Sequence, residues 1–229
     1  MIYLIPSFLA DEAIETIPPY ILTAVKTCQV IFAENERTTR RFLKSLSKAI
    51  VIDDFEWFPI HKVEQEQVDT LRQKINEGKH IAIISEAGCP GVADPGQLLI
   101  AAAQKMNAVI KPLVGPSSLL LALMASGLNG QHFAFVGYLP IDQTERIKKI
   151  RQLEEVSAAT DCTQIFIETP YRNNKLLETI IHHCHPRTQL CVAAELTSAH
   201  EWIKTKTIAE WSKETFDLHK KPAIFLLHG

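Results

Sequence analysis

The residues best suited to chemistry in this sequence are acids that come directly after short apolar runs. Glu86 follows the run His80 to Ser85, and Glu168 and Glu195 stand in the same position after two later runs. Short apolar runs of this kind are typical of buried strands, and ligands in open α/β sheets bind beyond the carboxyl ends of strands. A carboxylate in the position of Glu86 has no helix to cap and can accept hydrogen bonds from a ligand hydroxyl or amine.

The segment after Glu86 contains more glycine and proline than a simple connection needs. Gly88 and Gly91 carry no Cβ, so the backbone can come close to a ligand there. Asp94 and Pro95 match the N-cap and the first position of a helix, and we favour this structural role for Asp94. The loop matches neither GxGxxG nor GxxxxGK[ST], so a nicotinamide or ATP enzyme has little support.

Two further loops place polar side chains next to apolar segments. In the loop VGPSS, Gly115 allows close backbone approach, and Ser117 and Ser118 stand at the head of an apolar helix. A helix cap and a ligand contact are equally open interpretations of these two serines. In the loop IETPYRN, Glu168 and Arg172 can pair with each other or face a polar substrate.

The segment Ala33 to Lys48 predicts a helix with one cationic face. At about 100° per residue, Phe42, Leu43 and Leu46 share one face and the basic residues share the other. The basic residues are Arg37, Arg40, Arg41, Lys44 and Lys48. Five like charges without acids on the same stripe repel one another unless an anion meets them. Binding of a phosphate backbone therefore stands beside the plainer interpretation of a solvated face.

Strand-like and helix-like segments alternate along the chain, which predicts an α/β protein. The expected strands are Ile2 to Ile5, Val30 to Ala33, Ala49 to Ile52, His80 to Ser85, Ala108 to Lys111, Phe133 to Val136, Gln164 to Glu168, Leu190 to Ala194 and Ala223 to Leu227. The expected helices are Pro19 to Cys28, Thr38 to Lys48, Val63 to Glu77, Gly96 to Met106, Pro116 to Ser126, Gln143 to Val156, Lys175 to His183 and Ile208 to Glu214.

A division near Leu113 to Pro116 predicts two α/β domains, residues 1–113 and 114–229. The first five expected strands then form one sheet. The segment Thr197 to Thr207 contains Trp202 and Ile203 among polar residues and can add antiparallel strands. We therefore expect a mixed sheet in the C-terminal domain.

Composition indicates an ordinary globular protein. Hydrophobic residues make up 46% and charged residues 22% of the 229 residues, and no uncharged apolar run reaches the roughly 18 residues that span a bilayer. We therefore expect no membrane partner. The N-terminal MIYLIPSF lacks the basic region and cleavage site of a secretory signal, which predicts a cytoplasmic location. A net charge of −2 gives no global attraction to nucleic acid.

The five cysteines lack paired spacing, which argues against both a disulfide framework and a zinc knuckle. Reduced thiols fit best. The run His182-His183-Cys184-His185 is the one that suggests a metal. Adjacent side chains on a helix point in different directions and do not converge on one ion, so we expect no metal site.

Seven motifs in this order resemble the tetrapyrrole methylase superfamily. They are YLIPS, IFAENERT, ISEAGCPGVADPG, KPLVGPSSLLLALMASGL, FVGYLP, IFIETPYR and VAAELT, and PAIFLL follows near the C-terminus. Within the superfamily, the chain is most similar to the bacterial enzymes that methylate the 2′-hydroxyl of a cytidine in small-subunit ribosomal RNA. The resemblance implies two α/β domains, a homodimer, a partner in ribosomal RNA or the small ribosomal subunit, and S-adenosylmethionine bound in the cleft between the domains.

The resemblance also implies a set of cofactor-binding residues. The pocket is expected to be lined by Pro6, Glu86, Cys89, Ser117, Ser118, Ile167, Ala194 and Pro222. Cys89 stands where the family commonly has threonine, so we expect it to form part of the pocket wall and not to act as a nucleophile.

Several positions depart from the family pattern. After the first strand, the ribose-methylating relatives carry Pro-Ile-Gly-Asn-Leu, and this chain has Phe8-Leu9-Ala10-Asp11-Glu12. The family's Glu-Asp-Thr-Arg is here Glu34-Asn35-Glu36-Arg37, and Glu86 stands where the family usually has aspartate. A Lys-Gly-Glu before the last strand is replaced by Lys220-Lys221-Pro222.

Methyl transfer from a sulfonium is an in-line displacement, so the protein must align the acceptor oxygen and exclude water. A ribose hydroxyl is a poor nucleophile at neutral pH, and a nearby carboxylate can take its proton. We expect Glu34 to be this base, with Arg37 and Arg172 holding phosphate or orienting the acceptor. Two alternatives remain open at this point: methylation of a tetrapyrrole or another non-RNA substrate, and a cofactor-binding module without catalysis.

Overall fold

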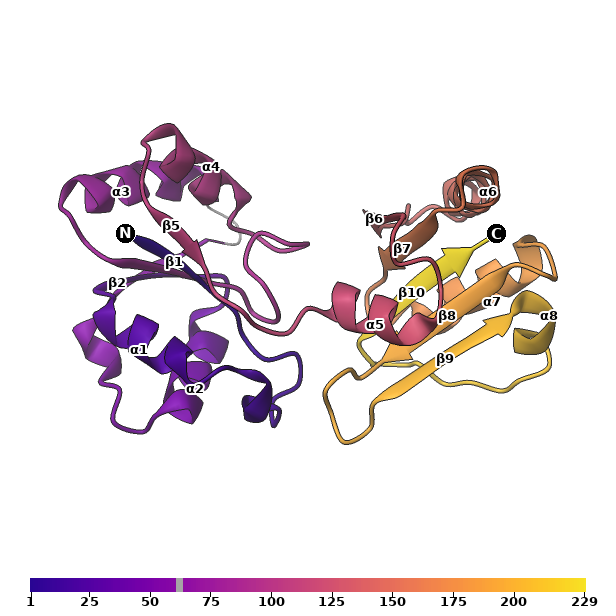
Figure 1. Cartoon of the computed structure of the whole chain (residues 1–229), viewed down its shortest axis with the longest axis horizontal. Helices are drawn as coiled ribbons and strands as arrows, with labels where there is room; N and C mark the ends of the chain where they lie inside the picture. The colour runs from indigo at the N-terminus through magenta and orange to yellow at the C-terminus, as the bar shows by residue number, and fades with distance from the viewer. Residues whose placement is uncertain (61–63) are drawn as a thin grey trace. The chain divides into compact units, whose positions relative to one another are not determined.

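The computed structural model describes residues 1–60 and 64–229, and the chain divides into two compact units (Figure 1). The first unit is Met1–Ser117 and the second is Ser118–Gly229. The division therefore falls four residues beyond the boundary expected after residue 113. Ser117 closes the first unit and Ser118 opens the second.

The first unit is built on a parallel sheet of five strands. They are β1 (Ile2–Ile5), β2 (Val30–Ala33), β3 (Glu56–Pro59), β4 (Ile81–Ile84) and β5 (Ile110–Pro112), in the order β3-β2-β4-β1-β5. Every neighbouring pair in this sheet is parallel. The carboxyl ends of all five strands therefore meet at one edge, where an open α/β sheet binds its ligands.

Helices cover both faces of this sheet (Figure 1). They are α1 (Tyr20–Thr27), α2 (Glu36–Leu46), α3 (Glu64–Asn76) and α4 (Gln97–Lys105). Phe42 and Leu43 of α2 pack into the core on the α1 side, and Leu71 and Leu99 pack into the core on the α3 and α4 side. All four residues of β2 and of β4 are buried, which is why these strands are continuous apolar runs.

One expected strand is wrong, and several expected boundaries differ from the structure. The expected strand Ala49 to Ile52 is wrong, because Ile52–Asp54 forms a short 3₁₀ helix and the edge strand is β3. In that run the Ile50 side chain is buried in the core, whereas Val51 is 53% exposed. The helix expected from Gly96 begins at Gln97, and the one expected to end at Glu214 ends at Trp211. The expected helix start at Val63 lies outside the described residues.

The second unit is built on a mixed sheet of five strands. They are β6 (Phe133–Tyr138), β7 (Thr163–Ile167), β8 (Gln189–Ala194), β9 (Trp202–Thr207) and β10 (Ala223–His228), in the order β6-β7-β10-β8-β9. β6 and β7 are parallel, and the other neighbours are antiparallel. The extra antiparallel strand expected around Trp202 is β9.

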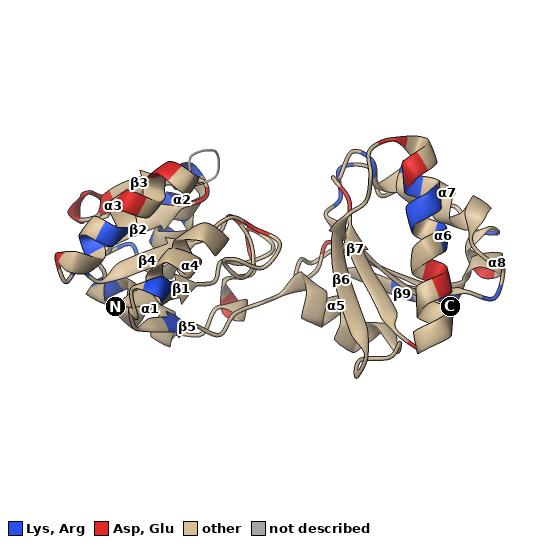
Figure 2. Ribbon diagram, turned by 90° about the horizontal axis from the view of Figure 1, so that it is seen from above, with Lys and Arg blue, Asp and Glu red and all other residues tan. Residues whose placement is uncertain are grey.

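The helices of the second unit differ in charge. They are α5 (Ser118–Ser126), α6 (Gln143–Thr160), α7 (Asn173–His183) and α8 (Ile208–Trp211). A 3₁₀ helix, Ile14–Thr16, belongs to the first unit. Figure 2 shows acidic and basic residues along α6 and none in α5. No helix in residues 1–60 and 64–229 has the length and apolar character needed to cross a membrane.

A close contact between two loops fixes the edge of the first sheet. Pro6 follows β1 and Gly115 follows β5, and a Cβ added to Gly115 would overlap the Pro6 ring. The sequence suggested that Gly115 lets the backbone approach a ligand. The structure instead gives it a packing role, because only a residue without a side chain fits beside the buried Pro6 ring.

Replacing Gly115 by alanine should therefore destabilise the first unit by about 1–3 kcal/mol, the usual cost of overpacking. Gly130→Ala is the matched control, because a Cβ there meets no atom within 4 Å. Urea unfolding should show a lower midpoint for Gly115→Ala and an unchanged or slightly raised midpoint for Gly130→Ala. Equal midpoints would show that the Pro6 contact does not constrain the loop.

Candidate functional site

The loops that follow β1, β4 and β5 are tied together at the carboxyl edge of the first sheet. The Ser7 N–H donates to the Gly88 carbonyl at 2.9 Å, and the Gly88 N–H donates back to the Ser7 carbonyl at 3.1 Å. The Cys89 thiol donates to the Pro116 carbonyl at 3.5 Å. These bonds join segments about 80 and 30 residues apart in sequence into one frame.

The glycine-rich loop after β4 needs its glycines for its own conformation. Gly88 has a φ of 71° and Gly91 a φ of 76°, a region that side chains other than glycine rarely adopt. A Cβ on Gly91 would also lie 2.9 Å from Cδ1 of Ile100. The abundance of glycine in this loop therefore has a structural cause, and the tight course brings its backbone back against the loop after β1.

Two acids at the ends of β2 and β4 are joined by a hydrogen bond, and one asparagine bonds to the second of them. Oε2 of Glu34 accepts a hydrogen bond from the Glu86 N–H at 2.7 Å, and the Asn35 side-chain amide donates to Oε1 of Glu86 at 3.1 Å. The other side-chain atom of Asn35, Oδ1, accepts from the N–H groups of Arg37 and Thr38 and so caps α2. Asn35 therefore fixes the start of the helix and one carboxylate at once.

A third acid, Asp94, belongs to the same cluster. The N-cap role expected for Asp94 is wrong, because the N-cap residue of α4 is Gly96. Burial, together with the charges of Glu34 and Glu86, raises the pKa of Asp94 to about 7. The Asp94 carboxyl therefore holds its proton up to near-neutral pH, and a cation bound beside it would favour loss of that proton.

Cys89 is held as a neutral thiol. Burial raises the pKa of the Cys89 thiol, and the charge of Asp94 adds to this effect. A reactive cysteine needs the opposite environment, which lowers the pKa and favours the thiolate. The expectation that Cys89 forms part of a wall and is not a nucleophile accords with this environment.

The cationic face of α2 is less free than the sequence suggested. Arg40 forms an ion pair with Glu36 at 2.5 Å, so the basic stripe does include an acid. The Arg40 guanidinium also lies over the Trp57 ring, 5.0 Å from its centroid. Lys44 donates to the Ile50 carbonyl at 2.6 Å. Arg41 is exposed and makes no ion pair among residues 1–60 and 64–229.

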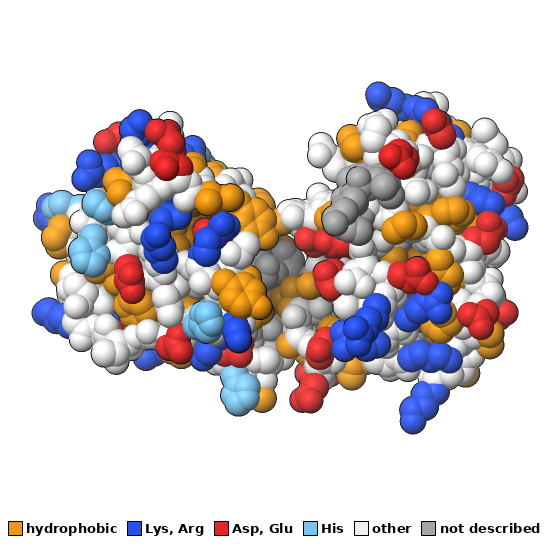
Figure 3. All heavy atoms as spheres, turned by 180° about the vertical axis from the view of Figure 1, so that it is seen from behind, with side chains coloured by type: hydrophobic (Ala, Val, Ile, Leu, Met, Phe, Trp, Pro, Cys, Tyr) orange, Lys and Arg blue, Asp and Glu red, His pale blue; other side chains and the backbone are white. Residues whose placement is uncertain are grey.

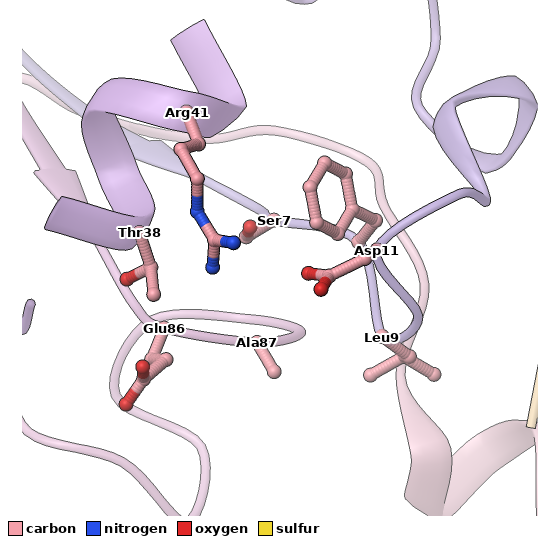
Figure 4. A pocket seen from close by; sticks show the side chains of 8 residues that line it. Ser7, Leu9, Asp11, Thr38, Arg41, Glu86 and Ala87 are labelled. Atoms are coloured by element: carbon pink, nitrogen blue, oxygen red, sulfur yellow. The ribbon is translucent and has the colours of Figure 1, made fainter. Parts of the chain in front are cut away.

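A pocket of about 200 Å³ lies between α2 and the loops after β1 and β4 (Figure 4). Its polar lining comes from Ser7, Asp11, Thr38, Arg41 and Glu86. The sequence analysis placed Glu86 and Arg41 in candidate sites but gave no binding role to Ser7 or Asp11. Asp11 lies in the loop that departs from the family pattern, which is the one sequence signal that pointed to it.

Glu168 and Arg172 form an ion pair within the second unit. Arg172 donates to Oε1 of Glu168 at 2.6 Å, and the same oxygen accepts from the Thr169 N–H at 2.6 Å. The Glu168 side chain is 1% exposed and that of Arg172 is 33% exposed. Of the two interpretations open in the sequence, the structure shows the internal ion pair.

Three of the expected cofactor-binding residues lie at one edge of the second sheet. β10 begins between the ends of β7 and β8, with Ile224 opposite Ile167 and Ala223 opposite Ala194. The Pro222 carbonyl accepts from the Glu195 N–H at 2.9 Å. Ile167, Ala194 and Pro222 are therefore neighbours, as Pro6, Glu86, Cys89 and Ser117 are grouped at the edge of the first sheet. Their common role in one pocket stays a prediction.

No group of three or more potential metal ligands is found in the described part of the chain.

The family described as Tetrapyrrole (Corrin/Porphyrin) Methylases matches residues 14–211. Ribosomal RNA small subunit methyltransferase I of Vibrio cholerae is 28% identical over 235 residues, which cover 100% of this chain and 77% of that protein. The protein of the same name from Escherichia coli O157:H7 is 28% identical over 232 residues, with the same coverage.

Solved structures share the fold at low identity. The methyltransferase CobJ has a TM-score of 0.66 at 16% identity and covers 100% of this chain and 93% of its own. Uroporphyrin-III C-methyl transferase from Thermus thermophilus, solved with S-adenyl homocysteine, has a TM-score of 0.58 at 15% identity and covers 99% and 96%.

This chain belongs to the tetrapyrrole methylase family, and it is a methyltransferase. The resemblance carried by the seven motifs and the expected α/β class are thereby confirmed.

Exchanging Asn35 for aspartate tests the link between the helix cap and Glu86. Aspartate caps a helix as well as asparagine does, but it cannot donate to the Glu86 carboxylate and adds a like charge beside it. Asn35→Asp should therefore lower the free energy of unfolding at pH 8 by about 1–2 kcal/mol, as loss of a hydrogen bond to a charged group does. The double variant Asn35→Asp/Glu86→Gln restores a donor and should recover most of this loss. If the double variant does not recover the free energy of unfolding, the loss comes from a weaker N-cap of α2 and not from the bond to Glu86.

Asp94 predicts a pH dependence of stability. Its pKa is 3.8 in the unfolded chain and about 7 in the fold, so the folded state holds the proton more tightly. The stabilisation from this proton is complete below about pH 4 and is lost as the pH rises to about 7. Asp94→Asn cannot ionise, so its stability relative to the wild type should rise from pH 4 to pH 7 and level off above. Parallel curves for the two proteins in denaturant titrations would contradict the raised pKa.

Proposed function

We propose that this chain transfers a methyl group from S-adenosylmethionine to the 2′-hydroxyl of a cytidine in small-subunit ribosomal RNA. The observation that carries the proposal is similarity over the whole chain to proteins named Ribosomal RNA small subunit methyltransferase I. The solved tetrapyrrole enzymes are 14–17% identical to this chain, which supports a common fold and leaves the substrate to other observations. Methylation of a tetrapyrrole and a non-catalytic binding role are less well supported.

The residues at the edge of the first sheet fit a cationic nucleoside cofactor. Glu34, Glu86 and Asp94 stand close enough for the charges of the first two to raise the pKa of the third. A sulfonium placed near them would relieve this repulsion, and it supplies an activated methyl group when bound. Glu86 is the acid we assign to holding the cofactor, since Asn35 and Glu34 fix its side chain and its backbone.

The expected cofactor-binding set takes one part from each unit. Pro6, Glu86, Cys89 and Ser117 belong to the first unit, and Ser118, Ile167, Ala194 and Pro222 belong to the second. Backbone groups at strand ends and small or apolar side chains predominate in this set, which suits a wall that excludes water around a reacting centre.

Glu34 is the group we assign to the proton of the acceptor hydroxyl. Its carboxylate lies at the end of β2, beside the Glu86 N–H, and can take the proton as the oxygen attacks the methyl carbon. Arg37, exposed in the first turn of α2, and Arg172, paired to Glu168, are assigned to orienting the phosphates of the acceptor. A homodimer and a cytoplasmic location complete the proposal and rest on the family resemblance and the sequence.

The substrate is tested with labelled cofactor. Purified protein is incubated with S-adenosylmethionine carrying a tritiated methyl group and with small ribosomal subunits, total RNA or a total cell extract. The label should enter small-subunit RNA and, after nuclease digestion, should appear as 2′-O-methylcytidine by mass spectrometry. Label found only in a small-molecule or protein fraction would contradict RNA as the substrate. The absence of a calorimetric signal with S-adenosylmethionine or its demethylated product would contradict the assignment of the cofactor.

Glu34→Gln tests the base. Glutamine keeps an oxygen that accepts from the Glu86 N–H but cannot take a proton, so single-turnover methyl transfer should fall by about 10²–10⁴. Cofactor affinity, measured by calorimetry, should change little. Glu36→Gln is the control, since Glu36 lies two residues further along and pairs with Arg40. Transfer at the wild-type rate in Glu34→Gln would remove Glu34 from the mechanism.

A further inference from the structure

The pocket between α2 and the loops after β1 and β4 contains charged groups that face one another without touching. Figure 4 shows the Arg41 side chain extending from α2 toward Ser7, with the Asp11 carboxylate on the opposite side. Arg41 and Asp11 make no ion pair in residues 1–60 and 64–229. The space between a carboxylate and a guanidinium suits a ligand with a hydrogen-bond donor at one end and an anionic oxygen at the other.

The floor of this pocket contains a buried serine. Ser7, which lines the pocket, is 3% exposed and carries a hydroxyl oxygen. Figure 4 shows this oxygen on the side of the pocket occupied by the Arg41 guanidinium. A serine hydroxyl at this place can accept a hydrogen bond from a polar ligand or donate one to it.

Arg41 also lines a second, more open groove. The groove measures about 540 Å³ and lies along Arg40, Arg41, Lys44 and Val51 to Asp53. Arg41 thus lines both a partly open pocket and a surface groove with two further cations. A small metabolite needs only the pocket, whereas a chain of phosphates uses both.

We propose that the pocket binds one sugar-phosphate unit of single-stranded RNA and that the groove binds the neighbouring phosphates. This inference rests on the proposed function and names the surface that holds the acceptor strand. A volume of about 200 Å³ equals about seven waters at liquid density, which suits a sugar-phosphate and falls below the ~300–1,000 Å³ of pockets for drug-sized ligands. Arg41 binds the phosphate, and Asp11 and Ser7 accept hydrogen bonds from ribose hydroxyls.

The local surface must supply this affinity, because the protein as a whole does not. The net charge is −2, and Figure 3 shows acidic and basic side chains interspersed on one face of both units. Long-range steering of RNA is therefore weak, and individual contacts such as that of Arg41 should be measurable.

Binding of a fluorescein-labelled cytidine decamer, followed by anisotropy without cofactor, tests the role of Arg41. Arg41→Gln should weaken binding about tenfold and reduce the slope of log K against log salt by about 0.7, the value for one phosphate contact on a single strand. Arg41→Lys should recover part of the affinity. Lys105→Gln is the control, because it removes an exposed cation from α4 on the other face of the sheet. An equal effect of the Arg41 and Lys105 variants would overturn the proposal.

The role of Asp11 is tested by comparing RNA with DNA. The wild type should bind the cytidine decamer more tightly than the deoxycytidine decamer, and Asp11→Asn should reduce this ratio severalfold, since Asp11 reads a ribose hydroxyl. A ratio that Asp11→Asn leaves unchanged would overturn the assignment of the sugar to this pocket.

These results separate the RNA surface from the proposed reaction. Arg41-dependent RNA binding without methyl transfer would support the surface and contradict the methyltransferase assignment to RNA. Methyl transfer to RNA by an Arg41→Gln variant that binds the decamer with full affinity would support the methyltransferase assignment and contradict the proposed RNA surface. An Arg41→Gln variant that loses affinity for S-adenosylmethionine but not for the decamer would assign the pocket to the cofactor and overturn the proposal.

Discussion

Parallel pairing of β2, β4 and β1 is the constraint on which the candidate site depends. Parallel neighbours end at the same edge of a sheet, so the residues after each of these strands are brought together although they lie far apart in sequence. The Ser7–Gly88 bridge then ties the loop after β1 to the loop after β4. Glu34 and Glu86 meet at this edge for the same reason, 52 residues apart along the chain.

Electrostatics at this edge explains why two departures from the family pattern occur together. The resemblance gives aspartate at both position 35 and position 86, and this chain has asparagine and glutamate. The Asn35 amide donates to the Glu86 carboxylate while its oxygen caps α2. An aspartate at position 35 would keep the cap and lose the donor, so the longer acid at position 86 and the neutral residue at position 35 form a matched pair. The cluster thereby keeps Glu34, Glu86 and Asp94 as its acids without adding a fourth.

Helix α2 connects this acidic edge to a cationic surface. The cap residue of α2, Asn35, belongs to the acid cluster, and Phe42 and Leu43 bury the apolar side of the helix. Arg41 lines both the pocket and the more open groove. Arg40 and Lys44 are partly engaged with Glu36, Trp57 and the Ile50 carbonyl, which holds them along the groove. One short helix can thus position groups that bind a cationic cofactor at its start and an anionic strand along its side.

The sequence by itself determined the elements whose signal is local. Val30 to Ala33 is an apolar run because it is buried on both faces as β2, and its bounds were predicted to the residue. The run Ala49 to Ile52 gave the same signal and is no strand, since its partner positions beside β2 are taken by Glu56–Pro59. Strand-end acids were likewise visible as candidates, because a residue following an apolar run is a feature of a few adjacent positions.

Only the tertiary structure decided which of these residues act on one another. It gave Gly115 a packing role against Pro6, moved the cap of α4 from Asp94 to Gly96, and placed the Asn35 amide on Glu86. It also set Ser7, Asp11 and Arg41 around one pocket. Hydrogen bonds, desolvation and charge coupling depend on distances of a few ångströms between segments far apart in the chain, and those distances are set by strand order and register, which no local run of residues encodes.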